Sequence, residues 1–191
     1  MFCLPDRQAV VVDIETTEAS LSELRGGFPD PVEIGAVKID SEFSVLDRFS
    51  CFVQPQHFSE FDEFCEELTG ISSADLEQAK TWRECWKDFA DFTSYQGLRL
   101  LSWNSSFDYG VLRQVYANSG ITYPHRHPFI CALSVVYGLA GIYGYRARNW
   151  SLKDVCERFG ILPEKRHRAL TGAMRCVEVM RAVAELEDGF E

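Results

Sequence analysis

Residues 9–17 read AVVVDIETT, an apolar run that ends in two acidic residues and two threonines. The apolar run predicts a buried strand. Side chains at i and i+2 of a strand point to the same face, so Asp13 and Glu15 place two carboxylates side by side at the strand's end. Two buried like charges are costly unless a cation neutralises them, and Mg²⁺ takes carboxylate oxygens together with substrate phosphates. A strand that runs into an acidic turn is the alternative, and these two residues alone do not decide between them.

The acidic pair belongs to a chain with the composition of a folded protein. Its 191 residues are 46% hydrophobic and 13% aromatic, which predicts one globular domain over residues 1–191. No apolar run approaches the length of a membrane span, and we expect neither membrane association nor a signal peptide. The seven cysteines are scattered and form no C-x-x-C pair. They indicate free thiols in a cytoplasmic protein without structural zinc.

The net charge of −10 is unfavourable for an extended duplex-binding surface. The charge is unevenly distributed, because residues 146–168 hold seven basic and three acidic side chains. A local basic segment can hold a phosphate while the rest of the chain stays acidic. A short strand end or a small nucleotide suits this distribution better than a duplex, although a solvated basic loop and helix face would give the same pattern.

Hydrophobic periodicity and turn residues predict an α/β protein, a mixed central sheet flanked by helices. We expect strands at 8–14, 32–39, 45–53, 98–102 and 129–131, of which the first three could form an antiparallel meander. We expect helices over 58–96 with a break near residues 69–70, from 105 or 106, from 151 to about 160, and over 169–186. Ser151 with Asp154 resembles a capping box at the start of one of them.

Two further polar segments follow predicted strands or loops. Asp108 lies in the first turn of the helix after the strand at 98–102, and ligands bind at the carboxyl ends of such strands. Asn104 precedes it. Both have a simpler explanation, because an acid stabilises a helix N-terminus and Asn is a common cap residue. His167 lies between two arginines that disfavour its protonation, so it could act as a general base, unless it belongs only to an exposed basic loop.

Together these segments resemble the DnaQ-like 3′–5′ exonucleases of the DEDDh group, which have a ribonuclease H-like fold. The resemblance covers nearly the whole chain. Five motifs carry it, in order: DIETT at 13–17, ELTGI at 67–71, NSSFD at 104–108, NWSL at 149–152 with CERFGI at 156–161, and HRAL at 167–170. Each motif is weak alone, but their order makes the match specific.

The resemblance implies two-metal hydrolysis of phosphodiester bonds at single-stranded 3′ ends of RNA or DNA, with Mg²⁺ or Mn²⁺ as the cofactor. By this resemblance Asp13 would bridge both metal ions and Glu15 would ligate one of them. Asp108 would act mainly through metal-bound water, and His167 would accept a proton from the attacking water. A homodimer is also compatible with the resemblance.

Substrate contacts follow from the same resemblance. The backbone around Thr16 and Thr17 would meet the terminal nucleotide, and Asn104 belongs to the same predicted site. Leu68 or a neighbour would wedge against the terminal base, with plain core packing as the alternative for Leu68.

One residue departs from the family pattern. The family has an aspartate five positions after the motif histidine, where it ligates a metal, and this chain has Gly172 there. Glycine is a poor helix residue, about 1 kcal/mol worse than alanine, so helix stability does not explain it. Glu178 lies six residues further on, roughly 240° around the helix, and should face elsewhere.

The sequence therefore leaves three functions open. A working exonuclease, weakened by Gly172, is favoured by the four retained residues. A non-catalytic relative that binds nucleic-acid ends or a partner protein is favoured by Gly172 and by the acidic surface. A polymerase proofreading module is the third.

Overall fold

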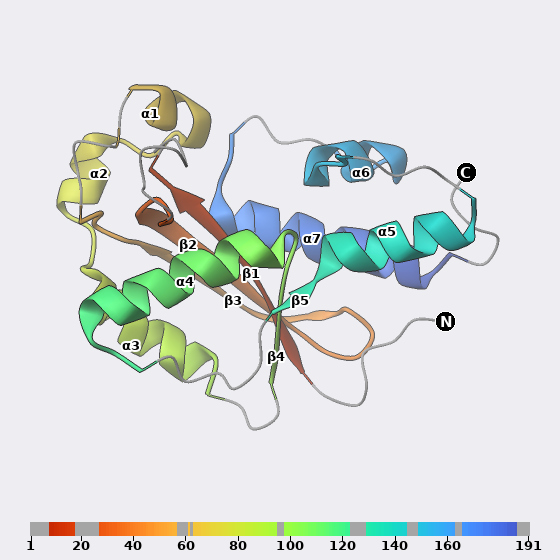
Figure 1. The fold of residues 1–191 in the computed structure, drawn as a ribbon, viewed down its shortest axis with the longest axis horizontal. Coiled ribbons are helices and arrows are strands. Elements are labelled where there is room, and N and C mark those ends of the chain that lie inside the picture. The colour runs from red at the N-terminus through yellow and green to blue at the C-terminus, as the bar shows by residue number, and fades with distance from the viewer. Residues whose placement is uncertain are drawn as a thin grey trace.

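The computed structural model describes most of the chain, in the ranges 8–17, 27–56, 61, 63–94, 98–122, 129–144, 149–162 and 166–186. A five-stranded mixed sheet in the order β3-β2-β1-β4-β5 forms its centre (Figure 1). Three strands form the predicted antiparallel meander: β1 (Ala9–Thr16), β2 (Pro31–Ile39) and β3 (Val45–Phe52). β4 (Arg99–Ser102) joins β1 in parallel, and β5 (Ile130–Cys131) joins β4 in parallel. The predicted α/β fold with a mixed sheet is confirmed.

Helices fill the connections between and after these strands. They are α1 (Glu63–Thr69), α2 (Ser73–Glu77), α3 (Trp82–Phe92), α4 (Ser105–Ser119), α5 (Ala132–Ile142), α6 (Leu152–Arg158) and α7 (Ala169–Ala184). The predicted break near Thr69 and Gly70 is confirmed, and a second break before α3 was not predicted. The capping box at α6 is confirmed, because the Ser151 side chain accepts from the Asp154 N–H and the Asp154 carboxylate accepts from the Ser151 N–H. No helix among the described residues is long and apolar enough to cross a membrane.

The alternation of side chains along β1 divides the core between the two faces of the sheet. Val10, Val12 and Ile14 pack with α3 and α4, whereas Ala9 and Val11 pack with α5, α6 and α7. Figure 1 shows these two groups of helices around the sheet. The odd-numbered positions of β1 therefore face α7. Asp13 and Glu15 continue this odd-numbered row beyond the apolar run.

A glycine in β2 brings the start of α7 against the sheet. A Cβ atom added at Gly35 would lie 2.1 Å from the backbone of Ala169 and of Leu170, so no side chain fits between strand and helix. Gly35 pairs with Asp13 across the antiparallel ladder. The first turn of α7 is therefore held beside the acidic end of β1.

Candidate active site

Three acidic side chains meet where β1 ends and α4 begins. Asp13 and Glu15 are half-buried on β1, and Asp108 in the first turn of α4 is only 4% exposed. They meet because β1 and β4 run in parallel, and α4 follows β4 after a short turn. The predicted juxtaposition of Asp108 with the strand acids follows from this topology.

Burial disfavours the negative charge of all three carboxyl groups, and neighbouring carboxylates add to this effect at Asp13 and Glu15. Burial raises the pKa of Asp13 well above its usual value, and Asp108, Glu15 and Glu33 raise it further. Burial, followed by the charges of Glu33 and Asp108, raises the pKa of Glu15 to about 7. Burial likewise raises the pKa of Asp108 to about 7, although hydrogen bonds from the Ser102 side chain and from backbone oppose the shift. The site is therefore an anionic cluster that a bound cation would stabilise.

Gly172, on the second turn of α7, lies directly against Asp13. A Cβ atom at Gly172 would lie 2.1 Å from Oδ2 of Asp13 and 2.8 Å from its Cγ. The Asp13 carboxyl group therefore occupies the space that any larger residue at position 172 would need. Any side chain there would require the Asp13 carboxylate to turn away from α7.

A buried ion pair fixes the segment that carries His167, and sequence reasoning missed it. Glu33 on β2 is fully buried, and its two carboxylate oxygens accept from Nη2 and Nε of Arg168 at 2.9 Å each. The same carboxylate accepts from the N–H of Ala169 at 3.0 Å and from the Ser50 hydroxyl at 3.2 Å. An acidic residue within the apolar strand 31–39 was the available signal, because a buried acid needs a partner.

His167 lies on the rim of the cavity that contains the acids. Its side chain is exposed, and its backbone N–H donates to the carbonyl oxygen of Leu68 at 2.9 Å. The cavity has a volume of about 420 Å³. It brings together the predicted residues Asp13, Glu15, Asn104, Asp108, His167 and Gly172 with four cations, Lys153, Arg166, Arg168 and Arg175. Acids at the base and cations around them suit a phosphate that is held next to a metal ion.

Other predicted contacts lie beside this cavity. Asn104 lines it, and its Oδ1 accepts from the Ser106 hydroxyl at 2.8 Å. Thr16 is half-buried at the end of β1, and Thr17 is buried and bound to Asp30, donating its N–H to the Asp30 carbonyl and accepting the Asp30 N–H at its hydroxyl. That backbone N–H is therefore engaged within the protein. Leu68 is 39% exposed, so core packing does not account for its side chain.

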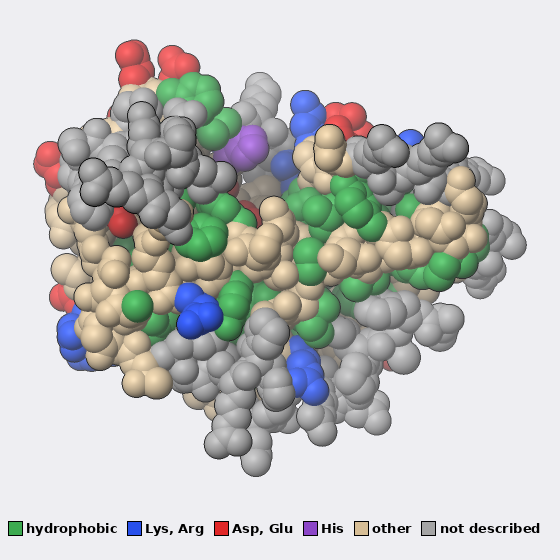
Figure 2. All heavy atoms as spheres, in the orientation of Figure 1, with side chains coloured by type: hydrophobic (Ala, Val, Ile, Leu, Met, Phe, Trp, Pro, Cys, Tyr) green, Lys and Arg blue, Asp and Glu red, His purple; other side chains and the backbone are tan. Residues whose placement is uncertain are grey.

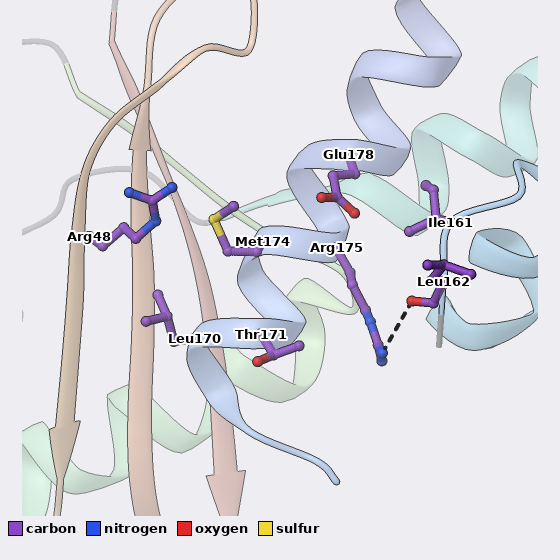
Figure 3. A pocket seen from close by; sticks show the side chains of 8 residues that line it. All are labelled: Arg48, Ile161, Leu162, Leu170, Thr171, Met174, Arg175 and Glu178. Carbon is purple, nitrogen blue, oxygen red and sulfur yellow. Dashed lines mark hydrogen bonds between the residues drawn. The ribbon is translucent and has the colours of Figure 1, made fainter. Parts of the chain in front are cut away.

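Glu178 faces a different depression, as predicted. Figure 3 shows it on α7 among the residues, including Arg48 and Met174, that line a groove of about 600 Å³, and it is not among the residues that line the acidic cavity. Thr171 and Arg175 line both this groove and the acidic cavity. Glu178 is therefore no substitute for an acid at position 172.

The donor atoms at the cavity fit a hard divalent cation, because they are carboxylate oxygens whose mutual repulsion such an ion would relieve. Within the described ranges, no three His, Cys, Asp or Glu side chains are already grouped closely enough to hold a metal ion. The Asp13 carboxylate packs against Gly172.

Several known proteins are similar to this chain in sequence. Residues 10–180 match the exonuclease family RNase_T. A Mycobacterium tuberculosis protein whose name describes a bifunctional exonuclease/endonuclease is 30% identical over 177 residues, which are 92% of this chain and 26% of that protein. A PolC-type DNA polymerase III of Thermotoga maritima is 28% identical over 187 residues, which are 93% of this chain. The chain spans only 12% of that polymerase's length.

Solved structures share the fold at low sequence identity. The nuclease domain of 3′hExo, a DEDDh family member solved with rAMP, superposes with a TM-score of 0.72 at 20% identity, covering 96% of this chain and 94% of that one. Escherichia coli exonuclease I, solved with single-stranded DNA and zinc, gives a TM-score of 0.76 at 16% identity over 94% of this chain and 41% of that one. These likenesses establish the fold.

Proposed function

We propose that the chain, which belongs to the RNase_T exonuclease family, is a DEDDh-type 3′–5′ exonuclease that removes nucleotides from single-stranded 3′ ends in a reaction that depends on Mg²⁺ or Mn²⁺. The observation that carries the proposal is the cavity in which Asp13, Glu15 and Asp108 meet His167. The family match over residues 10–180 also supports one exonuclease domain as the folding unit of residues 1–191.

Each residue of the cavity has a role in this proposal. Asp13, Glu15 and Asp108 would hold the divalent cation, which supplies Lewis-acid stabilisation of the charge that develops on the phosphodiester. The His167 imidazole accepts a proton from the attacking water, and its exposed position at the rim lets it return that proton to solvent. Lys153, Arg166 and Arg175 attract the phosphates of the strand. Asn104 lines the cavity, Thr16 follows Glu15 on β1, and the Leu68 carbonyl accepts the His167 N–H, so these three residues would meet the terminal nucleotide.

Gly172 reduces the number of anionic ligands at this site. We infer a weakened metal affinity, because the family's aspartate at this position is replaced by a residue with no side chain. The close packing of Gly172 against Asp13 supports the inference, because the heavy atoms nearest to a side chain at position 172 all belong to Asp13 and not to a second acid that could replace the missing ligand. The same observation favours a second candidate function, an end-binding relative with little or no hydrolysis.

The two candidates are separated by three proteins: the natural chain, Gly172→Asp and Asp108→Asn. Each is incubated with 5′-labelled single-stranded RNA and DNA in Mn²⁺, in Mg²⁺ and in EDTA, and products are resolved by length. We expect metal-dependent shortening from the 3′ end by the natural chain, faster shortening by Gly172→Asp, and none by Asp108→Asn. The exposed residue Asp88 on α3 gives the matched control Asp88→Asn, which should behave like the natural chain.

Degradation by Gly172→Asp alone would favour the end-binding candidate for the natural chain. If neither the natural chain nor Gly172→Asp shortens the oligonucleotides although both bind Mn²⁺, the exonuclease proposal is wrong for these substrates.

A further inference from the structure

Two cysteine side chains meet outside the acidic cavity, one on a strand and one on a helix. Cys51 on β3 is half-buried and Cys85 on α3 is fully buried, and both are free thiols. The Cys85 thiol donates a hydrogen bond to the Cys51 sulfur. Neither residue lines the cavity, and Figure 2 shows the histidine in a hollow near the top of the molecule, whereas α3 lies at the lower left in the same orientation in Figure 1. The proposed nuclease reaction therefore leaves this thiol pair without a role.

Aromatic packing holds the strand and the helix in the arrangement that brings the two sulfurs together. Phe49 is two residues before Cys51, so both side chains point to the same face of β3. Phe89 is four residues after Cys85 and shares its face of α3. The centroids of the Phe49 and Phe89 rings are 5.7 Å apart, and all four side chains belong to one core cluster. The fold therefore presents Cys85 directly to Cys51, which is the first requirement for a disulfide between two elements.

A lysine lies beside the pair at the end of β3. The Lys80 carbonyl oxygen accepts the Gln54 N–H at 2.9 Å, and the Lys80 ammonium group pairs with Asp88, three residues after Cys85 on α3. The hydrogen bond from the Cys85 thiol lowers the pKa of Cys51, and the charge of Lys80 lowers it further, while burial and Asp88 oppose the shift. The same hydrogen bond and burial raise the pKa of Cys85. Cys51 is therefore the member of the pair that ionises, and the ionised form of a thiol is its nucleophilic form.

We propose that Cys51 and Cys85 form a reversible disulfide when a hydroperoxide oxidises the protein, with Cys51 as the attacking thiol and Cys85 as the thiol that resolves the intermediate. The proposal does not depend on the nuclease proposal. The disulfide would link β3 to α3 and close a loop that contains α1 and α2.

The reaction proceeds in two steps. The Cys51 thiolate attacks one oxygen of the hydroperoxide, so that an S–O bond forms while the O–O bond breaks, and the leaving oxygen takes a proton. The Cys85 sulfur then attacks the sulfenic sulfur of Cys51, so that the S–S bond forms while the S–O bond breaks, and the Cys85 proton leaves with that oxygen as water. The two thiols lose two electrons and two protons to the peroxide. A dithiol reductant reverses the change by thiol–disulfide exchange.

The test uses the full chain, reduced, freed of reductant and treated with limiting hydrogen peroxide, either folded or unfolded in urea. Remaining thiols are alkylated, and tryptic peptides are identified by mass spectrometry without reduction. Trypsin releases Cys85 in the peptide of residues 84–87 and Cys51 in the peptide of residues 49–80, where fragmentation distinguishes Cys51 from Cys65. The linked peptide is therefore identified in the natural chain itself, even where a variant fails to fold.

Cys51→Ser and Cys85→Ser assign the two roles, and circular dichroism confirms that each variant is folded. Cys131→Ser is the matched control, because Cys131 on β5 is the other half-buried cysteine within the described ranges. We expect the folded natural chain and Cys131→Ser to give the linked peptide, and dithiothreitol to restore both thiols. Cys85→Ser should leave a sulfenic acid on Cys51 that dimedone traps, and Cys51→Ser should leave Cys85 as a thiol. The chain unfolded in urea should lose the preference for this linkage.

The inference is overturned if the folded natural chain keeps both thiols at a peroxide concentration that oxidises the unfolded chain. It is also overturned if dimedone labels Cys51 of the natural chain and no linked peptide forms, because Cys85 then fails to resolve the intermediate. The same set of linkages in the folded and the unfolded chain would show that the fold does not direct the pairing, and would refute it as well. These results are read from thiols, so they stand apart from any release of nucleotides.

Discussion

The ion pair between Glu33 and Arg168 should contribute strongly to the stability of the protein, because it joins β2 of the sheet to the segment that carries His167. Glu33→Gln replaces one carboxylate oxygen with an NH₂ group that must face the donors of the guanidinium. The change also leaves the Arg168 charge without its partner. Ala169 and Ser50, which donate to the same carboxylate, are affected as well.

The magnitude follows from the burial of each partner. Breaking a buried ion pair by removing one member costs about 3–5 kcal/mol. The Arg168 side chain is 38% exposed and can regain water when Glu33 is changed, so we expect Glu33→Gln to lose about 3 kcal/mol of unfolding free energy. The Glu33 side chain is 1% exposed and cannot regain water, so Arg168→Gln should cost more, about 4–5 kcal/mol.

Urea unfolding followed by tryptophan fluorescence measures these losses. The exposed pair of Lys80 and Asp88 supplies the control, and Asp88→Asn should cost less than about 1 kcal/mol. The double variant of Glu33 and Arg168 should lose less than the two single variants would lose together. The reasoning is refuted if Glu33→Gln costs no more than Asp88→Asn, or if Arg168→Gln is the milder change.

Three further predictions concern other features of the fold and the site. Because the folded-state pKa values of the site carboxyls are raised, the metal-free protein should be most stable near pH 4–5 and lose stability as the pH rises through about 7. Mn²⁺ should therefore raise the melting temperature at pH 8 but hardly at pH 5. Equal shifts of the melting temperature by Mn²⁺ at both pH values would contradict this prediction. Gly35→Ala should cost about 1–3 kcal/mol or more in urea unfolding, because backbone lies 2.1 Å from its new Cβ, whereas Gly138→Ala, which has open space in α5, should gain up to about 1 kcal/mol. Ser151→Ala should cost about 1 kcal/mol by the same measurement, because α6 loses its cap, and an unchanged midpoint would show that the capping box contributes nothing.

Features that depend on neighbours in sequence could be predicted from the sequence. The capping box of Ser151 and Asp154 is a local pattern, and so is the apolar run that forms β1. Asp108 could be placed near Asp13 because the carboxyl ends of parallel strands meet at one edge of a sheet. The first two features are set by strand or helix geometry over a few residues, and the third by a general rule for parallel strands.

Features that depend on distant parts of the chain could not be predicted. Glu33 finds Arg168 across 135 positions, and no local pattern identifies that partner. The helix α5 was also missed, because its strongly apolar sequence with two glycines shows no amphipathic period. Helix propensity gave no reason for a glycine at position 172. Close packing does, because the Asp13 carboxyl group occupies the space that a side chain there would need.

The ion pair has a consequence for the order in which the protein becomes complete. Asp13, Glu33 and Asp108 are synthesised long before Arg168, so one wall of the cavity is still missing when their part of the chain has been made. The segment from residue 166 to the end of α7 then supplies His167, the partner of Glu33 and the cavity cations Arg166 and Arg175. We therefore expect a nascent chain that stops before residue 166 to carry the acids but to lack the nuclease activity proposed for the whole chain.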